Sequence, residues 1–246
     1  MSVPRELHAA AGVVALSKPA GLPTQAAAGI ESLESWLRAR LYGPGSAASR
    51  GYLGVPHRLD RPVSGVLLMA ATPRAARKLS RQFERRQVRK TYLALVTPAS
   101  DAALPPGDEM AADEWRDLVE KVDAEPRGRI AAADAATARE AVTLASTWLR
   151  LPGAGRSPAL LRLEPLTGRM HQLRIQAAAR GLPVVGDLLY GGVADPAWGD
   201  GSRHDAIALH AWRIAYADPD SGAEVVVEAP LPEGWPDAAR AAAGTE

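Results

Sequence analysis

One passage of the 246-residue chain, residues 57–73, reads HRLDRPVSGVLLMAATP. Its first part, His57–Gly65, is polar and contains proline and glycine, which predicts a loop. The run Val66–Ala70 that follows is apolar and uncharged, and it ends just before Thr72 and Pro73. A run this short between turn signals is typical of a buried strand. The passage therefore predicts a charged loop that leads directly into the core.

A helix is predicted directly after this strand. Thr72 is a residue type that caps helix N-termini, and Pro73 suits the first turn of a helix. Leu79 and Phe83 are four residues apart, so they would share the inward face. The arginines between them would then point outward.

The rest of the chain predicts more strands than helices. Strands are expected at Gly12–Lys18, Lys90–Val96, Ala141–Leu149 and Ala159–Leu163, helices at Ser32–Leu41 and after Gly168, a hairpin at Leu209–Ala215 and Glu224–Glu228, and irregular segments at Gly43–Gly54, Thr97–Arg116 and Gly191–Asp205. This order predicts an α+β fold with a mixed, mainly antiparallel sheet and flanking helices. Since no repeat or clean linker is visible, residues 1–246 are predicted to form a single domain.

The composition excludes several classes of site. With 47% hydrophobic and 23% charged residues the chain resembles a globular protein, and with no cysteine it can form neither disulfides nor thiolate metal sites. The absence of cysteine suits a reducing compartment, so a cytoplasmic location is expected. The start of the chain lacks the apolar run of a signal peptide, and no stretch is long enough to cross a bilayer.

Basic residues are concentrated in one segment although the net charge is only +1. Between residues 74 and 90 a single acid, Glu84, stands among eight basic residues, namely Arg74, Arg77, Lys78, Arg81, Arg85, Arg86, Arg89 and Lys90. Such a concentration can bind a polyanion even when distant acids cancel the total charge. A solvated helix face would give the same pattern, so the segment by itself leaves both interpretations open.

Asp60 is the first candidate for chemistry. It lies between Arg58 and Arg61, and neighbouring arginines keep a carboxylate ionised, as a nucleophile or base must be at neutral pH. A loop aspartate in a structural salt bridge would look the same. The local sequence alone favours this second interpretation.

A second polar cluster occupies Gly168–Arg174 and continues into Gly181–Gly191. A glycine before a helix, with Arg169, His171 and Gln172 around its start, can present backbone amides and side chains to an anion together. The alternative is a capped helix whose polar start only meets solvent.

Taken together, these segments resemble the RluA family of RNA pseudouridine synthases. The motifs occur along nearly the whole chain in the family's order, and they are the Lys-Pro-x-Gly turn after Val13–Lys18, His-Arg-Leu-Asp at 57–60, Lys90-Thr91-Tyr92, Gly-Arg-x-His-Gln-Leu-Arg at 168–174, Gly-Asp-x-x-Tyr-Gly at 186–191, and the ending at 209–212 and 229–232. The resemblance implies a pseudouridine synthase catalytic domain with a central RNA-binding cleft.

The resemblance also implies roles for individual residues. Asp60 is expected to be the catalytic aspartate, Tyr92 to lie against the target uracil and take part in proton transfer, and Arg174 to pair with Asp60 and keep it ionised. The expected RNA-binding residues are Arg58, which would fill the gap left by the displaced uridine, and Arg61, Arg77, Arg81, Arg85, Lys90, Arg169, His171 and Gln172.

The chain departs from the usual family pattern at three positions. Val63 and Met170 stand where threonine is frequent, and Gln176 stands where histidine is frequent. These departures leave the catalytic assignment unchanged. Because the first motif begins at Val13, the small N-terminal RNA-binding module of many relatives is expected to be missing.

The implied reaction breaks the bond between ribose and uracil nitrogen, turns the base, and rejoins it through a ring carbon. No oxidation, group donor or net hydrolysis occurs, so neither a cofactor nor a metal is expected. The carboxylate could attack the substrate covalently or remove a ribose proton to give a glycal, and both routes stay open. The target base must be flipped out of its RNA, ribosomal or transfer RNA being the expected partner, with no membrane and no obligate protein partner.

Three other functions compete with this one. A metal-dependent hydrolase would need ligand histidines, but none of His8, His57, His171, His204 and His210 are closely spaced in a ligand pattern. A glycosidase could pair Asp60 with Asp187, although the setting of Asp187 is typical of a turn. An RNA-binding protein without activity would share the basic features but would not need Asp60, Tyr92 and Arg174 together.

Overall fold

The computed structural model describes residues 3–43, 51–99, 102–107, 109–123, 125–152, 157–194 and 206–244. The fold separates into two compact units. Unit 1 combines Met1–Lys90 with Ala211–Pro230, and unit 2 combines Thr91–His210 with Leu231–Glu246. Among the described residues, no helix is both long and apolar enough to cross a membrane.

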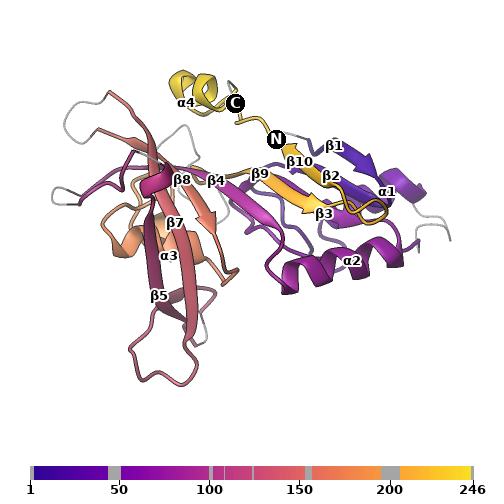
Figure 1. Cartoon of the computed structure of the whole chain (residues 1–246), viewed down its shortest axis with the longest axis horizontal. Coiled ribbons are helices and arrows are strands. Elements are labelled where there is room, and N and C mark those ends of the chain that lie inside the picture. Colours follow the sequence, from indigo (N-terminus) through magenta and orange to yellow (C-terminus); the bar gives the residue numbers. More distant parts are fainter. Residues whose placement is uncertain are drawn as a thin grey trace. The chain divides into compact units, whose positions relative to one another are not determined.

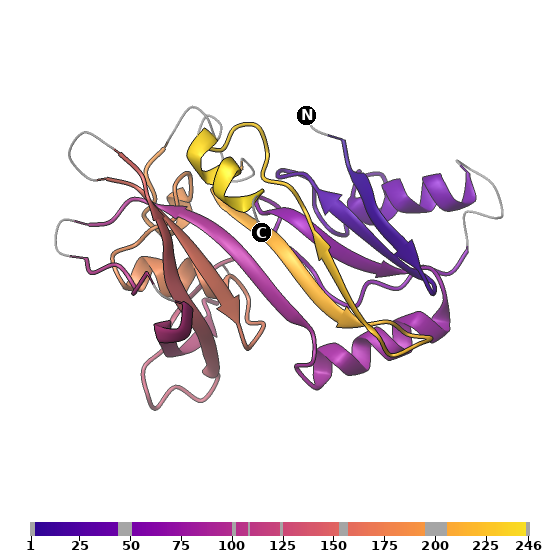
Figure 2. The same cartoon turned by 45° about the horizontal axis from the view of Figure 1, so that its top comes forward.

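Unit 1 is built on a sheet in the order β1-β2-β3-β9, with β10 paired to β9. The strands are β1 (Arg5–Ala10), β2 (Val13–Lys18), β3 (Ser64–Ala70), β9 (Leu209–Ala217) and β10 (Glu224–Glu228) (Figure 1). Pairs β1–β2, β2–β3 and β9–β10 are antiparallel, and the last forms the predicted hairpin, drawn in orange to yellow in Figure 2. Every residue of β3 is buried, as its apolar sequence predicts.

Two helices accompany this sheet, α1 (Leu33–Tyr42) and α2 (Pro73–Glu84). Ser32 caps α1 through a reciprocal capping box with Ser35, and Thr72 caps α2 by accepting a hydrogen bond from the Ala75 amide. The Thr72 cap agrees with the sequence prediction, whereas the Ser32 cap was not predicted.

The buried face of α2 differs in one respect from the prediction. Leu79 is fully buried as expected, but the next inward position is Gln82 rather than Phe83. The Gln82 amide donates to the Ala217 carbonyl and accepts from the Ala217 amide, both at 2.8 Å. Phe83 is only partly buried and stacks on His57 instead. The arginines of α2 point outward, as predicted.

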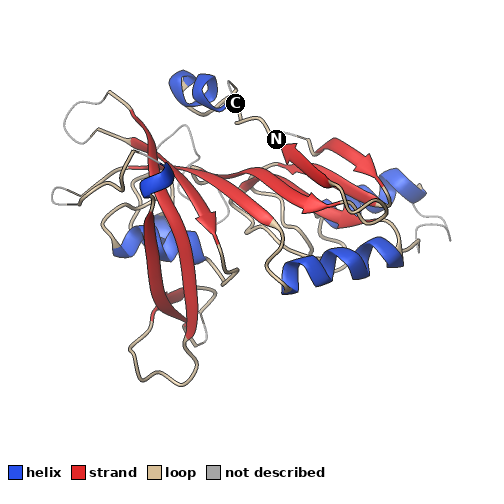
Figure 3. Ribbon diagram, in the orientation of Figure 1, coloured by secondary structure: helices blue, strands red, loops and turns tan. Residues whose placement is uncertain are grey.

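Unit 2 has the strand order β4-β8-β7-β5-β6. Its elements are β4 (Arg89–Val96, inside unit 2 from Thr91), η2 (Glu109–Ala111), β5 (Asp113–Lys121), β6 (Gly128–Ile130), β7 (Arg139–Arg150), β8 (Ala159–Pro165), α3 (Gln172–Ala179), η3 (Leu188–Tyr190) and α4 (Asp237–Ala243). All four of its strand pairs are antiparallel. With strands in red and helices in blue, Figure 3 shows that strands dominate the regular structure, which confirms the α+β class.

The predicted strands and helices are confirmed, but three strands were not predicted. The irregular connection expected at Thr97–Arg116 is wrong at its end, because β5 begins at Asp113. This strand reads DEWRDLVEK, and its charged residues outnumber the inward-facing Trp115 and Val119. Strands β1 and β6 were also missed. Much of the predicted loops at Gly43–Gly54 and Gly191–Asp205 lies outside the described residues.

Gly65 at the start of β3 is required by a close backbone approach. Its φ of 118° lies where L side chains are rare, and an added Cβ would lie 2.2 Å from the Ala211 carbonyl oxygen. Because backbone cannot move aside like a flexible side chain, β3 and β9 would have to separate.

We expect Gly65→Ala to lower the free energy of unfolding by at least about 3 kcal/mol, since it combines backbone strain with a backbone clash. Gly222→Ala is the matched control: Gly222 has a φ of 75°, but an added Cβ would meet nothing within 4 Å. The control should cost only about 1 kcal/mol. If urea denaturation shows that both variants lose the same free energy of unfolding, the close approach of β3 and β9 does not have the role assigned to it.

Candidate active site

The loop that carries Asp60 is held in place on both sides of that residue. On one side, the Thr24 hydroxyl donates to the Leu59 carbonyl at 2.9 Å and accepts from the Leu59 amide at 3.2 Å. On the other side, the Gly21 amide donates to the Arg61 carbonyl at 2.9 Å, and Arg61 Nε donates to the Gly21 carbonyl at 2.8 Å. Asp60 is thus a half-buried carboxylate on a loop whose backbone is fixed from both sides.

Lys18 at the end of β2 connects the same loop to the turn at residues 19–22. Its side chain is completely buried, and Nζ donates to the carbonyls of Pro19, Leu22 and Arg61 at 2.9, 2.8 and 3.1 Å. A buried ammonium needs such partners because it has lost its hydration. The lysine of the predicted Lys-Pro-x-Gly turn is therefore a structural centre of the Asp60 loop.

Burial lowers the pKa of Lys18 to about 7. The Asp60 carboxylate acts in the opposite direction and raises this pKa, while Arg61 lowers it further.

His57 supports the loop from the side of the core. Its Nε2 accepts a hydrogen bond from the Leu68 amide of β3 at 2.9 Å, and its ring stacks on Phe83 at 4.5 Å between centroids. Burial and, to a smaller extent, the charge of Lys90 lower the pKa of His57 to about 3. The imidazole is therefore neutral at physiological pH and acts as a packing group rather than as a ligand for anions.

In unit 2, Arg174 on α3 makes a two-point ion pair with Asp187. Nε donates to Oδ2 at 2.6 Å and Nη2 donates to Oδ1 at 2.7 Å, and the two side chains are 5% and 1% exposed. This geometry is the strong, orientation-dependent form of an arginine–carboxylate contact. Asp187 was predicted to belong to a turn, and its partner was not found, although it lies in the Gly-Asp-x-x-Tyr-Gly motif.

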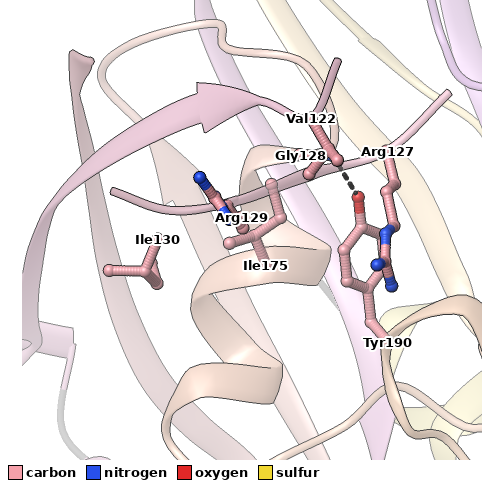
Figure 4. Close-up of a pocket in the computed structure, with 7 residues that line it drawn as sticks. All are labelled: Val122, Arg127, Gly128, Arg129, Ile130, Ile175 and Tyr190. Atoms are coloured by element: carbon pink, nitrogen blue, oxygen red, sulfur yellow. Dashed lines mark hydrogen bonds between the residues drawn. The ribbon is translucent and has the colours of Figure 1, made fainter. Parts of the chain in front are cut away.

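Tyr190 of the same motif links three parts of unit 2. Its hydroxyl accepts from the Gly128 amide at 3.0 Å and is 2.8 Å from His171 Nδ1. Its ring lies 4.9 Å from the Arg174 guanidinium carbon. Tyr190 also lines a cavity of about 290 Å³, together with Val122, Arg127, Gly128, Arg129, Ile130 and Ile175 (Figure 4).

The two buried glutamines of α3 have structural partners. The Gln172 amide contacts the Thr167 hydroxyl, the Arg169 amide, the Val142 carbonyl and the Thr143 hydroxyl. Gln176 contacts Thr143 as well as the β5 residues Trp115 and Asp117. Both side chains thus join α3 to the sheet of unit 2.

The predicted site residues fall into both units. Unit 1 holds Asp60, Arg58, Arg61, Lys90, Arg77, Arg81 and Arg85, and unit 2 holds Tyr92, Arg169, His171, Gln172 and Arg174. The pairing of Asp60 with Arg174 joins different units and stays a prediction. The RNA contact of Gln172 also stays a prediction, since the described partners of its amide lie within unit 2.

Several of these residues are exposed or half-buried. Arg58 and Arg61 are exposed, and Tyr92 is half-buried on β4 opposite Leu163 of β8. Lys90 is half-buried, and burial lowers its pKa. His171 precedes α3 in a left-handed conformation with a φ of 53°. Within the described ranges, no three histidines or acids are grouped as a metal site.

The low pKa of Lys18 predicts a pH dependence of stability. The folded chain releases this proton near pH 7, whereas the unfolded chain keeps it up to about pH 10.5. Unfolding therefore takes up a proton in this window, and the free energy of unfolding contributed by Lys18 rises with pH, by at most about 1.4 kcal/mol per unit. Between about pH 7 and about pH 9, the free energy of unfolding measured by urea denaturation should rise less for Lys18→Met than for the original chain. Lys121→Met, at an exposed position, should keep the original slope.

Comparison with known proteins points to one family. A profile of the RNA pseudouridylate synthase family matches residues 12–179. The tRNA pseudouridine synthase C of Salmonella typhi is 35% identical over 73% of this chain and 68% of its own length. The ribosomal large subunit pseudouridine synthase D of Xanthomonas campestris is 33% identical over 90% of this chain and 64% of its own length.

A solved structure, that of human RNA pseudouridylate synthase domain containing 1, has a TM-score of 0.71 and 26% identity, covering 94% of this chain and 84% of its own. The family profile includes both the Asp60 loop and α3, and the two relatives align with 73% and 90% of the present chain. This chain therefore belongs to the RluA family of RNA pseudouridine synthases, which are isomerases.

Proposed function

We propose that this chain converts specific uridines in structured ribosomal or transfer RNA to pseudouridine, with Asp60 as the catalytic carboxylate. The proposal is carried by one observation: the backbone is held on either side of Asp60, by Thr24 at Leu59 and by Lys18 at Arg61, and the Asp60 side chain itself is half-buried. A carboxylate on a fixed backbone beside a buried lysine is suited to a reaction that depends on its orientation and on its charge.

In the proposed reaction the target uridine leaves its stack and enters the site, where Asp60 meets the ribose. The bond between C1′ and N1 breaks, the detached uracil turns, and C5 bonds to C1′. The proton of C5 is lost and N1 gains one, so atoms and charge balance without a donor or an oxidant. Tyr92, which stands at the tyrosine position of the family motif, is proposed to take part in the proton transfer. Attack by Asp60 on the sugar and removal of a ribose proton by Asp60 are both compatible with this balance.

The exposed face of α2 is proposed to bind the RNA backbone. Arg77, Arg81 and Arg85 are four residues apart, so they form one stripe, and all three are exposed. Arg74 on the same helix is paired with Asp220 at 2.9 Å, whereas these three form no ion pair with any residue in the described part of the chain. A stripe of uncompensated positive charge favours phosphate over simple solvent exposure.

The relatives differ in the RNA that their names state, so both RNA classes stay within the proposal. The predicted central cleft, the single-domain organisation and the cytoplasmic location likewise remain predictions.

The substrate is best found by mapping pseudouridine in the RNA of a strain that lacks this gene. Sites that disappear, and that purified protein restores on a transcript, would identify it.

Asp60→Asn should reduce pseudouridine formation by at least about a thousandfold, because an amide has the shape of the carboxylate but is neither nucleophile nor base. Tritium release from RNA labelled at uridine C5 measures the reaction. Asp134→Asn, on an exposed loop, is the control and should keep full activity. An Asp60→Asn rate within about tenfold of the original, or about 1.4 kcal/mol in the barrier, would rule out the catalytic assignment.

Changing Arg77, Arg81 and Arg85 together to glutamate should weaken RNA binding and its dependence on salt. Each lost phosphate contact should lower the slope of log affinity against log salt by about 0.7 to 0.9. The control changes three exposed arginines that are already paired with acids, Arg40, Arg116 and Arg240, and so alters net charge equally. If both triple variants change the slope alike, the α2 stripe has no specific role.

A further inference from the structure

Strand β6 is the last strand of the unit 2 sheet, and in the described part of the chain its only strand partner is β5. Just before β6 begins, the Val122 amide donates to the Arg127 carbonyl at 2.9 Å. Just after β6 ends, the Ala131 amide donates to the Leu118 carbonyl at 2.8 Å. In an antiparallel ladder, hydrogen-bonded pairs alternate with pairs whose backbone groups point to the opposite edge. Because residues 127 and 131 are bonded toward β5, residues 128 and 130 have their backbone groups on the outer edge of β6.

Two backbone groups on this outer edge are available to a ligand. The Gly128 amide is already used, because it donates to the Tyr190 hydroxyl at 3.0 Å, and this bond confirms that the backbone of Gly128 points away from β5. Within the described residues, neither the Gly128 carbonyl nor the Ile130 amide has a hydrogen-bond partner. An acceptor and a donor two residues apart on one strand edge point in the same direction, so a single ligand can meet both.

The outer edge of β6 borders the cavity of about 290 Å³, since Gly128, Ile130 and Tyr190 all line it (Figure 4). Helix α3 closes this edge at one point, because an added Cβ at Gly128 would lie 2.9 Å from Ile175 Cδ1. Another strand therefore cannot pair along β6 at Gly128. The cavity is close to the lower limit of small-ligand pockets, which measure roughly 300 to 1,000 Å³, so its size suits one compact planar group.

Two arginines lie at the rim of this cavity, one on either side of Gly128 in the sequence. Arg127 is paired with Glu125 at 2.5 Å and is 45% exposed. Arg129 is paired with Glu120 at 2.9 Å and is 67% exposed. Exposed ion pairs of this kind are weak, so a phosphate can compete with the carboxylates or bind the other N–H groups of each guanidinium. An aromatic wall, a donor and an acceptor on a fixed backbone, and arginines at the rim are the groups that bind an unstacked nucleobase and its phosphate.

We propose that this cavity is a nucleotide-binding site that takes one unpaired base of the RNA, separate from the uridine that reacts. The base lies beside the Tyr190 ring, and its Watson–Crick edge meets the Gly128 carbonyl and the Ile130 amide. Every base has a donor next to an acceptor on this edge. The phosphate of the same nucleotide meets the two rim arginines. The proposal rests on the proposed function, which makes RNA the ligand, and all of the residues that form the site belong to unit 2.

The first test titrates the full chain, labelled with nitrogen-15, with the four nucleoside 5′-monophosphates and with ribose 5-phosphate, which has no base. The Ile130 amide resonance should shift with at least one nucleotide, because it gains a hydrogen bond, and should stay in place with ribose 5-phosphate. An Ile130 amide that no nucleotide shifts, or that ribose 5-phosphate shifts equally, would overturn the proposal. A shift that an extended valine-rich peptide causes and no nucleotide causes would assign the edge to a protein partner, and would overturn it too.

The second test removes the amide donor. Ile130→Pro should keep the fold, because proline is tolerated on an edge strand where the N–H points outward, and should weaken binding of a short single-stranded RNA of the preferred base at least about tenfold. Ile130→Ala keeps the amide and should bind within about threefold of the original chain. Val226→Pro is the matched control, since Val226 and Ile130 are both 39% exposed, and Val226 occupies an outward-pointing position on β10. If Ile130→Ala or Val226→Pro weakens binding as much as Ile130→Pro, the proposal is wrong.

These measurements separate this proposal from the proposed function. If the original chain forms no pseudouridine in any RNA but nucleotides shift the Ile130 amide, the proposed function fails and the nucleotide site is supported. If the chain is active and the amide does not respond, only the nucleotide site fails. With an active chain, Ile130→Pro should raise KM for the RNA about tenfold and keep kcat within about threefold, since the site binds and does not react. The nitrogen-15 titration of the original chain decides the question if Ile130→Pro does not fold.

Discussion

The buried ammonium of Lys18 is the constraint on which the rest of the Asp60 loop depends. It is completely buried, and it satisfies its charge by donating to three backbone carbonyls in two different turns. An unpaired buried charge would be very unfavourable, so the two turns must come together wherever Lys18 lies. Strand β2 carries Lys18, and strand β3 begins just beyond Asp60. The pairing of these strands in the core therefore sets the position of the proposed catalytic residue.

In unit 2, buried polar side chains are likewise held by hydrogen bonds, and one short helix carries several of them into the interior. Helix α3 has only eight residues, yet Gln172, Arg174 and Gln176 are all buried. Each has partners that match its hydrogen-bonding groups: strand β7 and Thr167 for Gln172, Asp187 for Arg174, and β5 with Thr143 for Gln176. Burial of so many polar groups is tolerated only when they are paired, and pairing in turn fixes their geometry. A helix of this kind is a rigid support for chemistry.

The departure from the family pattern at Gln176 is explained by this network. Its side-chain oxygen accepts from Thr143, and its amide nitrogen donates to Trp115 and Asp117, so both ends of the amide are used. A neutral histidine offers one donor and one acceptor in a ring, whereas an amide offers two donors and can join more strand groups at once. Val63 is likewise buried just before β3, where an apolar side chain suits the core.

Sequence by itself determined the elements whose signals are local: the apolar run of β3, the Thr72 cap with Pro73, the two strands before Gly168 and the helix after it, and the order of the family motifs around Asp60, Tyr92 and Arg174. It missed β5, because that strand is mostly charged and its two inward residues are too few to show a period. Only the tertiary structure could show the three carbonyls around Lys18, the neutral His57 under β3, and Asp187 as a partner of Arg174. These contacts join groups that composition and spacing leave unrelated, because a hydrogen bond depends on where the backbone brings two atoms and not on how far apart they lie in the chain.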